Sequence, residues 1–185
     1  MKVTPTELPE VVLVHTRTFG DDRGYFKEMW QASRYREAGI CGPFVQDNLS
    51  VSKKGVLRGL HLQVEPSPQG KLVSVLKGSV LDIAVDVRVG SPTFGQWVTE
   101  CLSEDNGCQL WVPYGFAHGF LALEDHSIVT YKCTAPYDHG AEIGISWQDP
   151  AFNLVLPKMN YALSQKDADA PNHDVFIHRL PRYSS

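Results

Sequence analysis

Glycine and proline interrupt this chain at short intervals, as at residues 90–92 (GSP) and 106–107 (NG). The segments between them are short and rich in Val, Ile, Leu, Phe and Tyr. Glycine and proline destabilise helix interiors and favour turns, so this spacing leaves little room for long helices. Many short apolar segments separated by turn signals are typical of an antiparallel sandwich or barrel. The sequence therefore predicts an all-β fold.

Residues 80–89 form the clearest predicted strand. All the odd positions are apolar, whereas Asp82, Asp86 and Arg88 lie at even positions. Side chains alternate between the two faces of a strand, so one face is apolar and the other is largely polar. The polar face could meet solvent, or it could line a polar cavity inside a barrel. The pattern leaves both alternatives open.

Other elements are predicted from the same signals. Residues 71–77 form a strand that is closed by Gly78, which predicts a hairpin into the next strand. Residues 128–133 form another strand, with a tyrosine in its middle. We expect helix only at residues 32–38 and for one turn after Ser164, whose side chain suits an N-cap.

The length, net charge and cysteine content of the chain limit the functions that it can have. At 185 residues the chain is expected to form one domain over residues 1–185, with a tail at 171–185 that matches no recognised pattern. The net charge is −4 without a basic run, so nucleic-acid binding is not expected. No apolar run approaches a membrane span, and the N-terminus lacks a signal-peptide core. The four cysteines have no C-x-x-C spacing, which favours reduced thiols in a cytoplasmic protein.

Two stretches each place one histidine in an apolar run that contains glycine. They are RGLHLQ at residues 58–63 and PYGFAHGF at residues 113–120. The second contains the Pro-x-Gly-x-x-His pattern of a cupin metal motif, but the first has His-x-Gln where such barrels usually supply two histidines. A metal held by His61, His118 and Glu65 is chemically feasible. The glutamine and the prolines around Glu65 argue against it, so we expect acid–base chemistry without a metal.

His61 is the candidate base. A neutral imidazole is well matched to proton abstraction near neutral pH. It needs a carboxylate to hold its tautomer, and the candidates are Asp82, Asp86 and Asp167. Tyr131 could donate a proton opposite the histidine, or it could be a packing residue with its hydroxyl bonded.

Cationic side chains could bind a substrate. Lys71 could stabilise a developing enolate, or it could lie solvated at a strand edge. Arg23 and Arg58 could hold a phosphate in fork geometry. Strict alternation places Arg58 and His61 on opposite faces of a strand. One pocket for both requires a bulge or bend at Gly59, and otherwise they serve different walls of a subunit boundary.

Together these motifs resemble the family of dTDP-4-dehydrorhamnose 3,5-epimerases. The matching stretches follow the family order from about residue 5 to residue 169. They are FGDDRG (19–24), FVQDN (44–48), GVLRGLH (55–61), QGKLV (69–73), DIAVDVR (82–88), SPTFG (91–95), QLWVP (109–113), GFAHGF (115–120) and YKCT (131–134).

The resemblance implies a cupin-type jelly roll, a homodimer, no metal or other cofactor, and a nucleoside-diphosphate 4-keto-6-deoxyhexose, most simply dTDP-linked, as substrate. It implies epimerisation at C3 and C5 through an enolate, with His61 as base, Tyr131 as acid and Asp167 as the carboxylate paired with the base. Tyr137 matches the aromatic residue that stacks on the thymine. The other implied substrate-binding positions are Arg23, Glu28, Gln46, Asp47, Asn48, Arg58, Lys71, His118, Glu142 and Lys166.

Three features depart from the family pattern. Leu62 replaces an aromatic residue, residues 154–157 lack a tryptophan, and the tail from Pro171 is unfamiliar. The alternative within the family is therefore an epimerase for C3 or C5 alone, or for another nucleotide sugar. The alternatives outside it are a metal-dependent cupin isomerase or oxygenase, and a sugar-binding cupin without catalysis.

Overall fold

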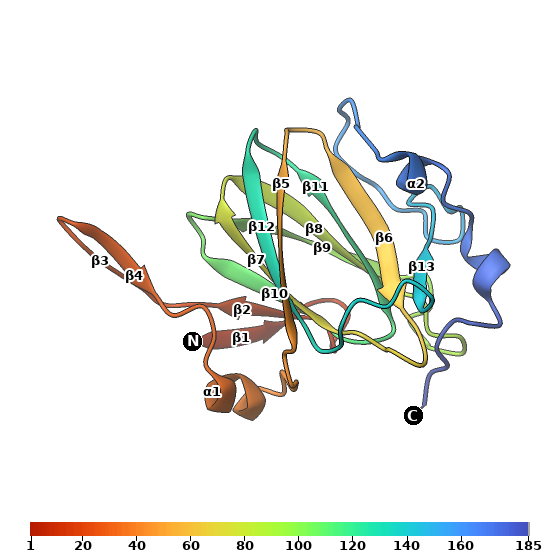
Figure 1. Cartoon of the computed structure of the whole chain (residues 1–185), viewed down its shortest axis with the longest axis horizontal. Coiled ribbons are helices and arrows are strands. Elements are labelled where there is room, and N and C mark those ends of the chain that lie inside the picture. Colours follow the sequence, from red (N-terminus) through yellow and green to blue (C-terminus); the bar gives the residue numbers. More distant parts are fainter. Residues whose placement is uncertain (185) are drawn as a thin grey trace.

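The computed structural model describes residues 1–184, and in it two antiparallel β-sheets pack against each other (Figure 1). The first sheet contains, in spatial order, β1 (Lys2–Pro5), β2 (Val12–His15), β10 (Cys108–Val112), β7 (Lys71–Lys77), β12 (Ser127–Cys133) and β5 (Gln46–Ser52). The second contains β13 (Glu142–Gly144), β6 (Leu57–Gln63), β11 (Phe116–Ala122), β8 (Ser79–Asp86) and β9 (Trp97–Ser103). The chain passes repeatedly between the two sheets, which is the connectivity of a jelly roll. The predicted all-β fold is confirmed.

The predicted hairpin at Gly78 is wrong. β7 lies between β10 and β12 in the first sheet, whereas β8 lies between β11 and β9 in the second. Gly78 has a φ of +71°, and a Cβ there would come within 2.7 Å of the Ser127 Oγ atom. Glycine tolerates both the positive φ and the close approach, so the chain changes sheet at this residue. The turn signal is local, but the choice of partner strand depends on how the sheets stack.

The polar face of β8 points into the interior of the molecule. Asp82 and Asp86 are both 0% exposed. Ala84, on the same face, belongs to the core between the two sheets, whereas Ile83 packs into a second core on the other side of the five-stranded sheet. Of the two alternatives for this strand, the interior polar face is confirmed.

Both predicted helices are present. α1 (Ala32–Glu37) packs Tyr35 against Leu72 and Trp111 on the outer face of the six-stranded sheet. α2 (Gln165–Ala168) begins at the predicted N-cap, where the Ser164 side chain accepts a hydrogen bond from the Asp167 backbone N–H. In residues 1–184 no helix is long and apolar enough to cross a bilayer.

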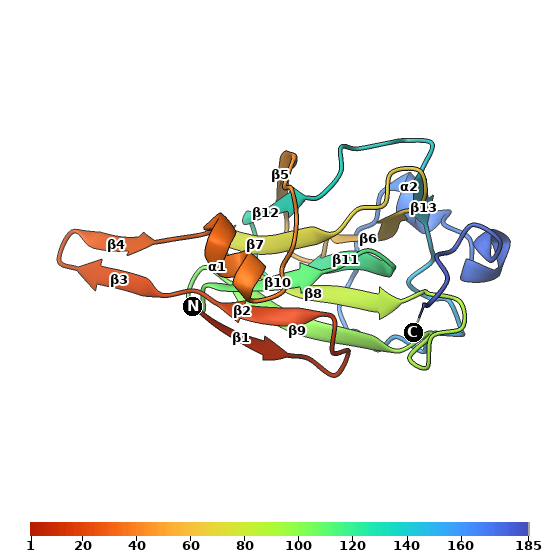
Figure 2. The same cartoon turned by 90° about the horizontal axis from the view of Figure 1, so that it is seen from below.

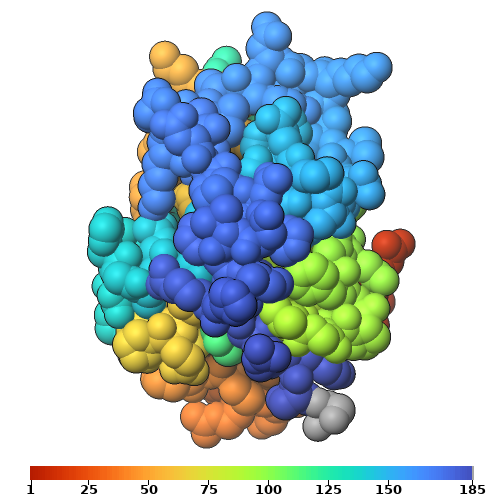
Figure 3. Space-filling model, turned by 90° about the vertical axis from the view of Figure 1, so that its right-hand side faces the viewer, coloured from red at the N-terminus to blue at the C-terminus, as the bar shows by residue number. Residues whose placement is uncertain are grey.

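The C-terminal segment covers the second core (Figure 3). Its 3₁₀ helix (His173–Phe176) is joined to the body by the His173 side chain, whose Nδ1 lies 2.8 Å from Asp149 Oδ2. Leu180 is 4% exposed, and the backbone of Pro181 accepts a hydrogen bond from Val89. The unfamiliar tail is therefore, over residues 171–184, a packed part of the fold that begins shortly after α2.

A two-stranded hairpin projects from the body on the side opposite α2 (Figure 1). It consists of β3 (Thr18–Asp21) and β4 (Gly24–Lys27), and we call it the arm. Phe19, Tyr25 and Phe26 on the arm are 50%, 62% and 68% exposed. Large exposed apolar groups gathered on one projection mark a surface suited to contact another molecule.

Candidate active site

A cavity of about 230 Å³ is lined by strands of both sheets and by α2. The lining includes all three predicted catalytic residues, His61, Tyr131 and Asp167, and four of the predicted binding residues, Arg58, Lys71, His118 and Lys166. These residues are far apart in the sequence, and the packing of the two sheets brings them to one place.

Asp167 is the carboxylate that pairs with His61. The His61 Nε2–H donates to Asp167 Oδ1 at 2.6 Å, which leaves Nδ1 as the ring nitrogen able to accept a proton. The other oxygen, Oδ2, accepts a 2.8 Å hydrogen bond from Ser164 Oγ. Burial raises the pKa of Asp167, but the hydrogen bonds and charge of His61, together with Ser164 and the Gly59 backbone N–H, outweigh it and leave that pKa below its ordinary value. Asp167 is therefore ionised at neutral pH and stabilises a protonated His61.

An irregularity at Gly59 explains how Arg58 and His61, which strict alternation would place on opposite faces of β6, can share one cavity. Pairing of β6 with β11 shifts register between His118 and Phe120, opposite Gly59, which has a φ of +101°. A Cβ on Gly59 would lie 2.6 Å from the His118 carbonyl oxygen, so only glycine fits. Of the two alternatives that the sequence leaves open, the irregularity at Gly59 is the one observed, and it lets Arg58 and His61 line one cavity.

A second histidine–aspartate pair lies next to the first. His118 is the register partner of His61 across β11 and β6, and its Nε2–H donates to Asp82 Oδ1 at 2.9 Å. Both side chains of this pair are buried. Asp82 Oδ2 is buried and has no hydrogen-bond partner within residues 1–184. Of the three aspartates considered for His61, Asp82 thus pairs with His118, and Asp86 bonds to Arg88 instead.

Tyr131 reaches the cavity from the six-stranded sheet, opposite the strand that carries His61. Burial, and next the nearby Cys133 thiol, raise the pKa of Tyr131 above its ordinary value. The phenol is therefore protonated at neutral pH and can donate a proton.

Lys71 lies above the Tyr131 ring, with Nζ 6.0 Å from the ring centroid. Burial lowers the pKa of Lys71 below its ordinary value. The Cys133 thiol and two carboxylates, Glu142 and Asp82, oppose that shift. A cation held in a partly desolvated cavity wall is suited to stabilise an oxyanion.

A polar chain runs from the cavity wall to Tyr137. Lys166 Nζ donates to Glu142 Oε2 at 2.5 Å, and the Tyr137 hydroxyl donates to the same oxygen at 2.8 Å. Burial raises the pKa of Glu142, but these two donors outweigh it and lower that pKa. Tyr137 remains 54% exposed, so its side chain is accessible to a planar ligand.

Gln46 and Asn48 are partly buried on one face of β5, whereas Asp47 lies exposed on the opposite face. Gln46 Nε2 donates to Asn48 Oδ1 at 2.9 Å. Asp47 is exposed on the other face of the strand and pairs with Lys132 at 3.0 Å. The structure thus separates the Asp47 side chain from the cavity.

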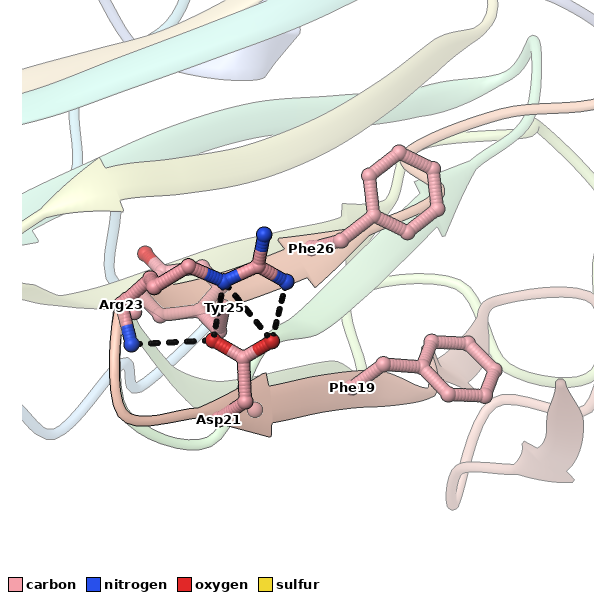
Figure 4. Close-up of a pocket in the computed structure, with 7 residues that line it drawn as sticks. Phe19, Asp21, Arg23, Tyr25 and Phe26 are labelled. Carbon is pink, nitrogen blue, oxygen red and sulfur yellow. Dashed lines mark hydrogen bonds and ion pairs between the residues drawn. The ribbon is translucent and has the colours of Figure 1, made fainter.

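The structure also places Arg23 and Glu28 away from this cavity. Arg23 lies at the turn of the arm, where it pairs with Asp21, and the exposed rings of Phe19 and Phe26 lie farther along the two strands (Figure 4). Glu28 follows the arm and pairs with Arg34 on α1 at 2.7 Å. Neither contributes to the cavity of its own chain.

The alternative metal site requires Glu65 beside His61 and His118. Glu65 is exposed beyond the end of β6, and it does not line the cavity. Across the part of the chain that the structure describes, no three His, Cys, Asp or Glu side chains are grouped to hold a metal ion. The donor set proposed from the sequence does not fit a metal.

The sequence does not predict the roles of Asp82 and Ser164 at this site, nor that Ser50 and Phe120 line the cavity. The sequence leaves Asp82 as a candidate partner of His61 and predicts Ser164 only as a helix cap, whereas in the structure Asp82 bonds to His118 and Ser164 bonds to Asp167. The strand register indicates that Asp82 pairs with His118. His118 on β11 is opposite Ala84 on β8, so Asp82 lies two residues away on the same face.

Comparison with known proteins gives consistent matches. A family model described as dTDP-4-dehydrorhamnose 3,5-epimerase matches residues 5–174. The dTDP-4-dehydrorhamnose 3,5-epimerase of Sinorhizobium fredii is 50% identical over 167 residues, which cover 89% of this chain and 86% of that protein.

Solved structures show the same fold. The dTDP-6-deoxy-D-glucose-3,5-epimerase of Legionella pneumophila, in complex with dTDP-4-keto-L-rhamnose, has a TM-score of 0.96 at 47% identity, over 100% of this chain and 99% of that chain. A 3′-monoepimerase from Streptomyces bikiniensis, in complex with dTDP-quinovose, has a TM-score of 0.91 at 30% identity, over 97% of this chain and 92% of that chain. The fold alone therefore does not decide how many carbons are inverted.

Proposed function

This chain belongs to the dTDP-4-dehydrorhamnose 3,5-epimerase family and is an isomerase of that kind, and we propose that its His61, Tyr131 and Lys71 carry out the chemistry. The substrate is a dTDP-linked 4-keto-6-deoxyhexose, and the reaction inverts C3 and C5. Both carbons flank the C4 carbonyl, so removing either proton gives an enolate with its charge on O4. The substrate thus supplies its own electron sink.

The base and the acid come from opposite walls of one cavity, and this observation carries the proposal. His61 is on β6 of one sheet and Tyr131 is on β12 of the other. His61 Nδ1 takes a proton from one face of the ring, and Asp167 stabilises the imidazolium that forms. Tyr131 returns a proton to the opposite face, which inverts the carbon.

Lys71 and His118 bind the sugar around O4. Lys71 Nζ stabilises the enolate oxygen as negative charge develops there. Asp82 holds His118 through Nε2, so the other ring nitrogen is free for a sugar hydroxyl or O4. The buried donors and the small cavity keep water from the enolate.

The nucleotide occupies the polar surface next to the cavity. Arg58 and Lys166, both in the lining, pair with the diphosphate, and Tyr137 stacks on the base. Gln46 and Glu142, which bond to Tyr137, and Asn48, which bonds to Gln46, complete the nucleotide-binding surface.

Deuterium exchange tests the reaction and the two roles together. With dTDP-4-keto-6-deoxyglucose in D₂O, the wild type should give product with deuterium at C3 and C5, read by NMR. Tyr131→Phe should lose inversion more than exchange, because His61 still removes the proton while its return from the other face fails. Deuterium at a single carbon would identify a monoepimerase, and equal loss of exchange and inversion in Tyr131→Phe would refute the acid role.

Arg23 and Glu28 serve the same reaction in a homodimer. They lie on or beside the arm, which projects away from the cavity of its own chain and exposes Phe19, Tyr25 and Phe26. An arm that crosses to a partner places Arg23 at the nucleotide of the partner's site and buries these rings.

Mixed dimers test this arrangement. Equal amounts of His61→Asn and Arg23→Ala protein, each inactive alone, are unfolded and refolded together. If the arm serves the partner, half of the dimers carry one intact site, so about a quarter of wild-type activity returns. No recovery, in a mixture shown to contain mixed dimers, would mean that the arm serves its own chain.

The same proposal includes a cytoplasmic location. Cys41, Cys101, Cys108 and Cys133 are free thiols in the structure, and free thiols persist in reducing compartments.

A further inference from the structure

Three glutamine side chains hold the segment that carries Tyr137. This segment, residues 134–141, connects β12 to β13 as a long strap outside the sheets (Figure 2). Gln69 Nε2 donates to the Ala135 carbonyl at 2.7 Å. Gln63 Nε2 donates to the Pro136 carbonyl at 3.1 Å, and its Oε1 accepts from the Asp138 N–H at 2.9 Å. Gln46 Oε1 accepts from the Tyr137 N–H at 2.8 Å.

Each of the four consecutive residues from 135 to 138 thus makes one backbone hydrogen bond to a glutamine amide. We call Gln46, Gln63 and Gln69 the glutamine cradle. They begin β5, end β6 and precede β7, so the cradle is anchored to three strands from both sheets.

Gln63 is the centre of the cradle. It is 3% exposed, and its Nε2 also donates to the Ser67 carbonyl at 2.9 Å, so both of its N–H groups and its oxygen are bonded. Buried amides need such partners, and a fully bonded amide has one orientation. This is the residue that stands where a cupin metal motif would usually place a histidine.

The cradle acts on an exposed aromatic ring. Tyr137 is held by Gln46 through its backbone and by Glu142 through its hydroxyl, while the residue stays 54% exposed. An exposed ring on a long connection would otherwise lose conformational freedom when a ligand stacks on it. Holding the ring in place before the ligand arrives removes that loss from the binding free energy.

We propose that Gln63, assisted by Gln69, is a positioning residue for the nucleotide: it preorganises Tyr137 as a stacking platform without touching the substrate. This inference rests on the proposed function, because Tyr137 contacts a ligand only if the base binds there. It assigns the glutamine a task in nucleotide affinity, separate from proton transfer at His61, two residues earlier on the same strand.

Gln109 provides a matched control. It is also a buried strand glutamine, 1% exposed, and its Nε2 donates to the Met29 carbonyl and to Ser74 Oγ, both at 2.8 Å. Its contacts lie under α1 and not at the strap. Gln109→Leu therefore removes a comparable buried amide elsewhere.

The test measures dTDP binding by calorimetry, and kcat and KM with the dTDP-linked sugar. Gln63→Leu should weaken dTDP binding and raise KM about five- to tenfold, with kcat changed less than about twofold. Gln109→Leu should leave the dTDP affinity at the wild-type value. The double variant Gln63→Leu/Tyr137→Ala should bind dTDP no more weakly than Tyr137→Ala alone, because the two residues act through one platform.

Additive losses in the double variant, or a loss in kcat with unchanged KM, would overturn the positioning role. If Gln63→Leu does not fold, Gln69→Leu carries the same test through the Ala135 contact. If Tyr137→Ala binds dTDP as tightly as the wild type, the platform itself is refuted while epimerase activity of the wild type stands. If the wild type does not bind dTDP at all, the proposed function fails first, and this inference fails with it.

Discussion

His61–Asp167 and His118–Asp82 are neighbouring histidine–aspartate pairs that are built in different ways. The first joins a strand to α2, across 106 residues of sequence, and the His61 side chain is 27% exposed. The second joins adjacent strands of one sheet, and its side chains are 7% and 0% exposed. Both histidines line the cavity, but His61 is the more exposed of the two, whereas His118 lies deeper in the wall with its aspartate fully buried.

The aspartates differ as much as the histidines. Both Asp167 oxygens are bonded, to His61 and Ser164, so its charge is directed at one imidazole. Asp82 has one oxygen bonded to His118 and one buried oxygen without a partner within residues 1–184. Its charge also acts on Lys71, where it opposes the loss of a proton. The two histidine–aspartate pairs therefore have different tasks. Asp167 stabilises the charged form of the base His61, whereas the charge of Asp82 favours the protonated form of Lys71 in the cavity wall.

The largest effect should separate the two histidines. His61→Asn should lower kcat by at least ~10²- to 10⁴-fold at both carbons, since it removes the general base, while dTDP affinity is retained. His118→Asn should lower kcat by about tenfold, because it removes a sugar contact and leaves the base in place. Steady-state kinetics with calorimetric dTDP binding measure both. Equal losses in the two variants would show that the pairs are not functionally distinct.

The second effect concerns the alkaline limb of the rate profile. Lys71 must be protonated to stabilise the enolate, and burial already lowers its pKa while Asp82 opposes that shift. Asp82→Asn removes the opposition, so the pKa of Lys71 falls further and kcat declines at lower pH than in the wild type. Asp167→Asn should lower kcat while leaving this limb in place. An alkaline limb that moves in Asp167→Asn and stays fixed in Asp82→Asn would contradict the assignment.

The smallest effect is on stability. The pKa of Asp167 is lowered in the folded state, so its ionised form stabilises the fold above the unfolded pKa of about 3.9. That contribution is lost as the pH falls from there through the lowered folded pKa. The difference in Tm between wild type and Asp167→Asn should therefore be constant from pH 7 to about 4 and shrink at lower pH. A difference that is unchanged at pH 2 would mean that Asp167 contributes no ionic stabilisation.

Much of the fold was predictable because its signals are local. These signals each act over a few residues: the alternation at residues 80–89, the Ser164 helix cap and the glycines at turns. The strand, the helix and the turns that they predict are present. The hairpin at Gly78 failed because the partner of a strand is chosen by residues far away in sequence. The residue types alone left three aspartates open for His61. Family resemblance favoured Asp167, and the structure brings that residue to the imidazole.

The residue pattern alone was enough to predict that this chain forms short strands, that one face of β8 is polar, and that Gly59 permits a bend in its strand. Each of these depends on backbone geometry within one strand or turn. The packing of the two sheets was needed to show that the polar face turns inward, that Asp82 pairs with His118, and that Gln63 holds the segment that carries Tyr137. The tertiary structure also placed Arg23 on an arm that leaves its own cavity. These outcomes depend on which strands become neighbours when the two sheets bury their apolar faces, and that choice is made by the whole chain at once.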